Sequence, residues 1–384
     1  MQFTYYIVYS IFVFGLFISY NPALCVLYKY TRDYLINNNL FFLEPAETAF
    51  SLDIKPISYP DKCELKQIHL FSRHGSRYPA PNDIINYEKL EKYKNPFPMR
   101  KNFQLVERGE IEPFFDGLQC RKRYKKFWDG VEYDPEVIKF QSSQTTRTGA
   151  SLMAFSEGLF NGYGPLDTCK SQPIYYWNLP PEQDDTLSLV TSCRRWNETV
   201  NTNNPLRDEQ IYLYVPFIFT NCQFWLTVYN RTDAWCSLLS PKELLLSRYY
   251  WDLDFYYRLS YGSPLNLRMG CRYITQLVNG VEGYFYGNST VIADLKNSHG
   301  FTMTMILTTL VCKSVHVQYR LIPWSSTLYS EIYKCSGNHV YIRILLNFKP
   351  FYIPGCGEYC EWNKFKMILG DKIGCDYEKL CAYP

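Results

Sequence analysis

The chain has 384 residues, 40 Lys and Arg against 37 Asp and Glu, and a formal net charge of +3. This small charge, with basic residues spread along the chain, excludes the strongly basic balance of a nucleic-acid-binding protein, so we expect no nucleic-acid partner. Hydrophobic residues make up 47% of the sequence. That fraction argues against disorder and is enough for one large domain with an insertion or for two modest domains.

The first 25 residues predict a secretory signal peptide. An apolar, aromatic run from Tyr5 to Tyr20 is followed by Ala23-Leu24-Cys25, which suits cleavage after small residues, although no positive charge precedes the run. The run is nearly long enough to cross a bilayer, so an uncleaved anchor is the alternative. After cleavage we expect no stable membrane span.

The cysteines and glycosylation acceptors indicate the secretory pathway. The chain has 14 cysteines, and its N-x-S/T acceptors are Asn197, Asn230 and Asn288. This combination predicts a glycosylated protein that is secreted or held in the endoplasmic reticulum lumen. Cleavage after Cys25 would leave an odd number of cysteines, so at least one would be free or would pair with another chain. A zinc site is the alternative use, but Cys356 and Cys360 lack a second pair at zinc spacing.

The most informative segment follows the first strand candidate. Residues 26–62 have no strong periodicity and predict an extended N-terminal arm, after which an apolar stretch, Gln67 to Ser72, predicts a buried strand. It runs directly into R-H-G-S-R-Y-P, in which His74 stands between Arg73 and Arg77. Side chains that follow a strand of an open α/β sheet lie at the ligand crevice.

Two arginines that flank a histidine indicate phosphate chemistry. A guanidinium group presents a planar fork of donors to phosphate oxygens, and the imidazole of His74 could attack phosphorus. A turn histidine between two surface charges is the alternative interpretation, which the long pattern after an apolar strand disfavours.

Further elements follow in order. We expect helices between Asp83 and Lys94 and over Ile111 to Trp128, and a short strand over Val137 to Phe140. A polar turn then leads into an apolar helix, Leu152 to Phe160. Arg147 lies in that turn, where a third guanidinium could reach the same phosphate.

The second half of the chain predicts an insertion and a return to the sheet. Residues 169–283 are rich in Trp, Tyr and Asn and include a helical stretch, Pro241 to Tyr257, which predicts a mainly helical insertion. A strand candidate, Val291 to Leu295, then leads to His299 and an apolar run, Met303 to Val311.

These motifs resemble the histidine acid phosphatases. R-H-G-x-R-x-P, the frame S-S-x-x-x-R-T around Arg147, and His299 before an apolar helix occur in that family's order. The multiple inositol polyphosphate phosphatases fit best, because their H-A-E-T motif aligns without gaps to residues 299–302. A coincidental signature in another secreted domain is the remaining alternative, which several frames in family order disfavour.

The resemblance implies a fold and a mechanism. The fold would be a phosphoglycerate-mutase-like, three-layer α/β sandwich over residues 63–168 and 284–384, with residues 169–283 as a helical cap. His74 would form a phosphohistidine with phosphate from inositol polyphosphates, and no metal or cofactor would be required. The groups that would hold the phosphate oxygens are Arg73, Arg77, Arg147 and His299.

The resemblance also implies covalent links and one further strand. It suggests disulfides between Cys63 and Cys335 and between Cys236 and Cys271. The segment from Tyr341 to Asn347 is similar to the family's last sheet strand.

One departure concerns the family's proton donor. The residue after the second histidine is Asp in one subgroup, and the next residue is Glu in the other, but this chain has Gly300 and Phe301. No carboxylate occurs between Lys296 and Cys312. Because a positioned acid typically accelerates a reaction about 10²–10⁴-fold, two interpretations stay open. The chain is either a phosphomonoesterase, with weak activity or an acid from elsewhere, or an impaired relative that binds phosphate esters.

Overall fold

A computed structural model describes residues 60, 62–81, 97–166, 170–203, 214–229, 234–311 and 322–382. The expected signal peptide, nearly all of the expected arm and the expected helix between Asp83 and Lys94 lie outside these ranges. Within them, no helix combines the length and the apolarity that crossing a membrane requires.

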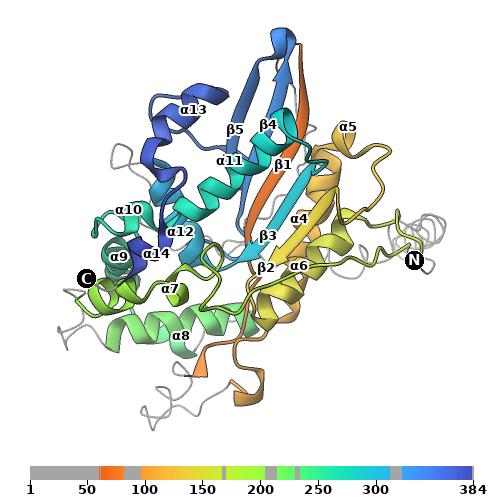
Figure 1. The fold of residues 1–384 in the computed structure, drawn as a ribbon. Helices are drawn as coiled ribbons and strands as arrows, with labels where there is room; N and C mark the ends of the chain where they lie inside the picture. Colours follow the sequence, from red (N-terminus) through yellow and green to blue (C-terminus); the bar gives the residue numbers. More distant parts are fainter. Residues whose placement is uncertain are drawn as a thin grey trace, which may run out of the picture.

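A mixed sheet forms the centre of the fold (Figure 1). Its order is β2-β3-β1-β4-β5-β6, with β7 paired to β5. The strands are β1 (Cys63–Arg73), β2 (Ile138–Ser142), β3 (Ala293–Ser298), β4 (Thr327–Cys335), β5 (Val340–Leu346), β6 (Lys349–Pro350) and β7 (Cys360–Glu361). β1 and β2 both pair in parallel with β3, whereas β4 and β5 are antiparallel. The carboxyl ends of β1, β2 and β3 therefore meet at one end of the sheet.

Helices cover both faces of this sheet, as Figure 1 shows. The α-helices are α4 (Glu107–Arg123), α5 (Lys125–Trp128), α6 (Thr146–Leu159), α7 (Leu189–Ser192), α8 (Tyr214–Tyr229), α9 (Pro241–Leu259), α10 (Asn266–Met269), α11 (Cys271–Tyr286), α12 (Gly300–Val311), α13 (Trp362–Leu369) and α14 (Tyr377–Cys381). The 3₁₀-helices are η3 (Met99–Lys101), η6 (Ala234–Leu238), η7 (Ser336–Asn338) and η8 (Gly370–Lys372), and η4 (Trp196–Asn201) is a π-helix.

The core lies in two layers on either side of β1. Leu70 packs with residues of α4 and α6, whereas Phe71 packs with residues of α11 and α12. Successive side chains of a strand point to opposite faces, so a strand covered on both sides is apolar without interruption. This three-layer α/β arrangement with helices on both faces confirms the predicted fold class.

The middle of the chain adds helices beside the sheet. α9 begins with a capping box, in which Ser240 and Glu243 satisfy each other's backbone N–H groups. α11 begins inside the expected insertion of residues 169–283, yet Ile274 and Leu277 pack in the sheet's core. The boundaries of the insertion remain a prediction.

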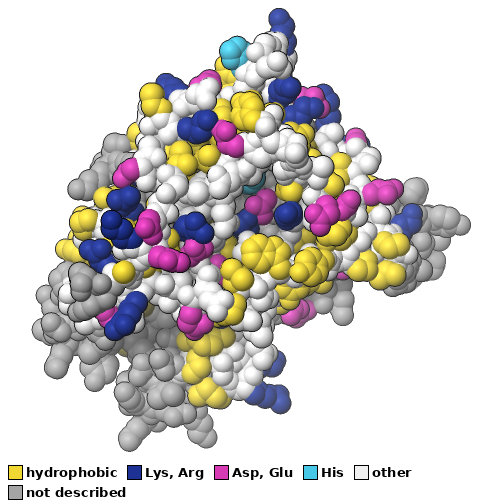
Figure 2. Space-filling model, viewed as in Figure 1, with side chains coloured by type: hydrophobic (Ala, Val, Ile, Leu, Met, Phe, Trp, Pro, Cys, Tyr) yellow, Lys and Arg dark blue, Asp and Glu magenta, His cyan; other side chains and the backbone are white. Residues whose placement is uncertain are grey.

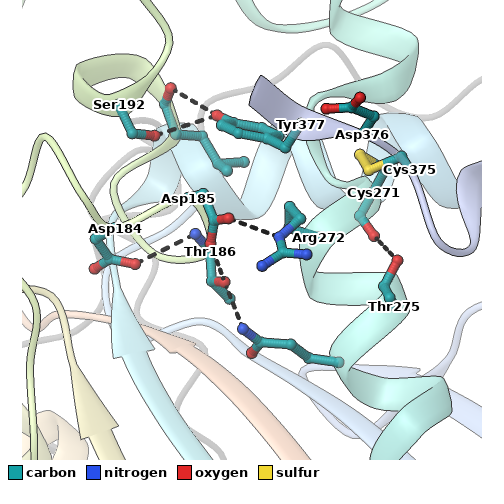
Figure 3. Close-up of polar contacts among 12 residues, drawn as sticks. Asp184, Asp185, Thr186, Ser192, Cys271, Arg272, Thr275, Cys375, Asp376 and Tyr377 are labelled. Atoms are coloured by element: carbon teal, nitrogen blue, oxygen red, sulfur yellow. Dashed lines mark hydrogen bonds and ion pairs between the residues drawn. A yellow bond between two sulfur atoms is a disulfide. The ribbon is translucent and has the colours of Figure 1, made fainter. Parts of the chain in front are cut away.

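A polar network fastens the loop before α7 to α11 and α14 (Figure 3). Asp185 accepts a hydrogen bond from Arg272 Nε at 2.6 Å, and Thr186 accepts one from Gln276 Nε2 at 2.8 Å. The Tyr377 hydroxyl of α14 donates to the backbone carbonyl of the first residue of α7 at 3.3 Å. The network holds the loop and α7 against α11 and α14.

The disulfides confirm one expected pairing and overturn the other. Among the described residues, the bridges are Cys63–Cys335, Cys193–Cys381, Cys222–Cys236, Cys271–Cys375 and Cys356–Cys360, and Cys120 is a buried free thiol. Cys63–Cys335, which links paired positions of β1 and β4, was predicted correctly. The predicted pairing of Cys236 with Cys271 is wrong, because η6 folds back on α8 while the start of α11 lies against the C-terminal segment.

Both charge signs are interspersed over the surface. Figure 2 shows Lys and Arg side chains next to Asp and Glu on the face in view, with hydrophobic side chains gathered over α6. On this face neither sign forms a continuous field, in keeping with the small net charge of +3.

Candidate active site

Three parallel strands bring the expected site residues together. Arg73 ends β1 and His74 follows it, His299 stands between β3 and α12, and Arg147 lies in the first turn of α6 after β2. Arg147 Nε donates to His74 Nε2 at 3.3 Å, and Arg147 Nη2 donates to His299 Nδ1 at 3.3 Å. The two imidazole rings are 5.5 Å apart between centroids. Segments far apart in sequence thus form one cationic cluster.

The loop after β1 is pressed against the start of α4. A Cβ atom on Gly75 would lie 1.9 Å from the carbonyl oxygen of Gly109, so only glycine permits this approach. The Glu112 carboxylate accepts the backbone N–H and the hydroxyl of Ser76, both at 2.8 Å. Gly75 N–H donates to Ser151 Oγ at 3.0 Å. These hydrogen bonds fix the loop that directly follows His74.

Hydrogen-bond partners define the tautomer of His74. Its Nδ1 lies 2.9 Å from the Gly75 carbonyl oxygen, which can only accept, so Nδ1 carries the proton. Arg147 can only donate, so Nε2 carries the lone pair. Burial, followed by the charges of Arg147 and Arg73, holds the pKa of His74 well below its usual value. His74 is therefore a neutral imidazole whose Nε2 lone pair faces Arg147.

Arg73 is held between an aromatic ring and a glycine. Its Cζ lies 3.7 Å from the centroid of the Trp324 ring, and its Nη1 donates to the carbonyl of Ile322. On the other side, a Cβ at Gly300 would lie 3.0 Å from Arg73 Nε, a buried atom with no hydrogen-bond partner among the described residues. The same indole lies 5.2 Å from the His74 ring. Trp324 therefore contacts both.

Aromatic rings also line the other two arginines. Arg77 Cζ lies 5.2 Å from the Phe103 ring centroid and 5.4 Å from that of Phe224. Arg147 Cζ lies 4.9 Å from the Phe103 centroid. Burial, then the charge of Arg77, lowers the pKa of Arg147 to about 9. Crowded cations in an apolar lining are poised to bind an anion, because its charge relieves their repulsion.

The sequence interpretation missed this aromatic lining. Phe103, Phe224 and Trp324 lie far apart in sequence and belong to no motif. The only available signal was the abundance of aromatic residues, 18% of the chain, which does not single out any of them.

His299 is joined to a buried hydroxyl chain. Its Nε2 lies 3.0 Å from Ser143 Oγ, which donates to Thr148 Oγ1 at 3.1 Å. Thr148 Oγ1 in turn donates to the Ser143 carbonyl at 2.7 Å. Burial, then the charges of Arg147 and Arg77, keeps the pKa of His299 well below its usual value. His299 is thus a neutral imidazole.

Phe301, at the position of the family's Glu, packs against a neighbouring helix. Its ring lies 5.4 Å from the Phe255 ring of α9, in an edge-to-face arrangement. Arg258 Cζ, paired with Asp254, lies 5.5 Å from the Phe301 centroid. Within the described ranges, no carboxyl group hydrogen-bonds to His74 or His299. Nor do three or more His, Cys, Asp or Glu side chains there gather as metal ligands.

Comparisons with known proteins show similarity to phosphatases. Residues 64–216 match the histidine phosphatase superfamily (branch 2). Multiple inositol polyphosphate phosphatase 1 of Dictyostelium discoideum is 27% identical over 271 residues, 59% of this chain but only 43% of that protein. Thiamine-repressible acid phosphatase pho4 of Schizosaccharomyces pombe is 24% identical over 374 residues, 78% of each chain.

Solved structures share the fold. The phytase from D. castellii has a TM-score of 0.67 at 20% identity, over 88% of this chain and 87% of that one. The Bifidobacterium longum multiple inositol polyphosphate phosphatase, in complex with inositol hexasulfate, has a TM-score of 0.62 at 12% identity, over 86% and 96%. The matched region and these relatives show that the chain is similar to histidine phosphatases of branch 2, and the solved structures show that it shares their fold.

Proposed function

We propose that the protein is a phosphomonoesterase of the secretory pathway that hydrolyses inositol polyphosphates through a phosphohistidine on His74. The observation that carries the proposal is the pair of contacts made by Arg147, whose guanidinium bridges His74 Nε2 and His299 Nδ1 at 3.3 Å each. A phosphoryl group bound by this guanidinium would meet the lone pair of His74.

The mechanism has two steps. His74 Nε2 attacks phosphorus, the bond to the ester oxygen breaks and the alcohol leaves. Water then attacks the phosphohistidine and releases inorganic phosphate. The groups proposed to hold the non-bridging oxygens and offset the charge of the transition state are Arg73, Arg77, Arg147 and His299. These guanidinium groups can neutralise the phosphoryl charge, so the mechanism needs no metal or cofactor.

The substrate class rests on the relatives and on the sequence. One relative is named a multiple inositol polyphosphate phosphatase, and one structure with the same fold holds inositol hexasulfate. The order H-x-x-T at His299 and Thr302 agrees with that branch. The secretory location is supported by the disulfides and by two exposed acceptors, Asn197 and Asn288.

A second candidate is a catalytically impaired relative that binds phosphate esters. It is favoured by Gly300 and by the packing of Phe301 on α9. Such a protein would bind inositol hexakisphosphate without releasing phosphate from it.

The test is phosphate release from inositol hexakisphosphate and from an aryl phosphate by the secreted, glycosylated chain. We expect release from both substrates, lost in His74→Ala and kept in His339→Ala, which changes an exposed histidine between β4 and β5. Tight binding with no release from either substrate would select the second candidate. Absence of both binding and release would overturn both.

A further inference from the structure

Neither position of the family's acid offers a proton donor here. Gly300 has no side chain, and the Arg73 side chain fills the space beside it. Phe301 packs on α9 and carries no proton to give. Among the described residues, the groups that already contact the cluster are then the candidates to protonate the leaving alcohol.

Hydrogen-bond directions show which nitrogen of His299 lacks a proton and could gain one. Arg147 donates to Nδ1, so in the neutral ring Nδ1 carries the lone pair and Nε2 the proton. Nε2–H is committed to Ser143 Oγ, whose hydroxyl donates to Thr148, which donates to a backbone carbonyl. Each donor in this series of hydrogen bonds already has an acceptor. Nδ1, on the Arg147 side, is the position where a proton can be gained and lost.

The substrate can supply that proton. A phosphate monoester has a second pKa of about 6, so near that pH it arrives partly as a singly protonated ester. Among three guanidinium groups the dianion is favoured and the proton leaves. The two lone pairs next to Arg147 are His74 Nε2, which must stay free to attack, and His299 Nδ1.

We propose that His299 Nδ1 is the proton donor to the leaving alcohol, in place of the absent carboxyl group. This inference rests on the proposed phosphomonoesterase function. The Nδ1 proton passes to the ester oxygen while that oxygen's bond to phosphorus breaks and the bond between phosphorus and His74 Nε2 forms. The products are a neutral alcohol, phosphohistidine and neutral His299.

In the second step, hydrolysis of the phosphohistidine, His299 acts as a base instead of an acid. His299 Nδ1 takes a proton from the water that attacks the phosphohistidine, and phosphate carries this proton away. One water is consumed, and one alcohol and one phosphate are formed, so atoms and charge balance. Burial, followed by the charges of nearby arginines, holds the pKa of His299 below its usual value, and a bound phosphate would offset the part that these charges cause.

The experiment compares leaving groups. An alkyl leaving group, as in inositol hexakisphosphate, needs a proton, whereas the 4-nitrophenolate of an aryl phosphate needs almost none. We expect His299→Asn, whose amide can still bond to phosphate or Arg147, to lower kcat/KM about 10²–10⁴-fold on the alkyl ester and far less on the aryl ester. His339→Asn is the matched control, with neither substrate affected.

Equal losses on both esters in His299→Asn would overturn the proposal and leave His299 as a phosphate-binding group. If His299→Asn does not fold, Ser143→Ala is the second variant that tests the proposal. By freeing the Nε2 proton from its acceptor, it should lower turnover of the alkyl ester more than the aryl ester and shift the pH profile. An unchanged profile and ratio would overturn the proposal. Failure of the wild-type chain on both esters would instead contradict the proposed function itself.

Discussion

Gly300 lies against Arg73, and a Cβ at this glycine would be 3.0 Å from Arg73 Nε and 3.2 Å from its Cζ. Because residue 300 has no side chain, the Arg73 side chain fits between this residue and the Trp324 ring. The glycine that replaces the family's acid in the sequence therefore leaves room for the Arg73 guanidinium, which is proposed to bind phosphate.

Gly300→Asp should therefore lower activity even though it restores the family's H-D pattern. The added carboxylate would displace Arg73 or form an ion pair with it, in competition with phosphate. We expect an increase in KM of about tenfold or more, equivalent to about 1.4 kcal/mol, measured with an aryl phosphate. Gly300→Ala, which adds the Cβ without the charge, is the control and should have a smaller effect. A gain in turnover of an alkyl phosphate would contradict this account.

We expect the aromatic ring of Trp324 to contribute to activity. Replacement by Leu removes the stacking on Arg73 and the contact with His74. A desolvated cation–π contact contributes about 2 kcal/mol, so we expect a loss of about 30-fold in kcat/KM, with Trp324→Phe retaining most of the activity. Trp177→Leu, at a more exposed tryptophan, is the matched control. Equal activity of the Leu and Phe variants would show that the ring is not needed.

Phe301→Glu should not rebuild the missing acid. The side chain at 301 packs on Phe255 and lies beside Arg258, so a carboxylate there would pair with that arginine. We expect the free energy of unfolding to fall by about 1–3 kcal/mol, with no gain in alkyl phosphate turnover. Urea denaturation and the two-substrate assay measure both quantities. A tenfold gain on the alkyl ester would show that the side chain reaches the active site.

Asp116 should make stability depend on pH. Burial raises its pKa to about 8, so the folded chain keeps this carboxyl protonated, whereas the unfolded chain releases the proton near pH 4. The folded state therefore binds more protons between about pH 4 and pH 8, and this group's contribution to stability is lost as the pH rises through that window. Asp116→Asn should remove the dependence, so its advantage over the wild type should grow toward pH 8. Denaturation curves at several pH values would measure this difference. A constant difference would contradict a protonated Asp116.

Sequence patterns predicted part of the sheet and several of its helices. The strands expected over Gln67 to Ser72 and Val137 to Phe140 are β1 and β2, with shifted ends. The helix expected over Pro241 to Tyr257 is α9. Such segments are predictable because apolar periodicity and turn residues are local signals. The site residues could be grouped because each follows the carboxyl end of a parallel strand, while their catalytic roles remain proposals.

Contacts between distant segments were not predictable in the same way. The wrong pairing of Cys236 with Cys271 arose because the sequence does not show that η6 folds back on α8. Likewise, nothing local marks Trp324 as the ring over Arg73, because the two are brought together by the pairing of β1 with β4. The cysteine pairing and the position of Trp324 both depend on packing between segments that are distant in the sequence.

The most direct test of the central claim is to trap the covalent intermediate. The chain would be mixed briefly with a phosphate ester labelled at phosphorus, quenched under conditions that preserve phosphohistidine, digested, and its peptides analysed for label. The account predicts acid-labile label on the peptide that contains His74, and none in His74→Asn. Steady phosphate release with no label, or label on any other residue, would contradict it.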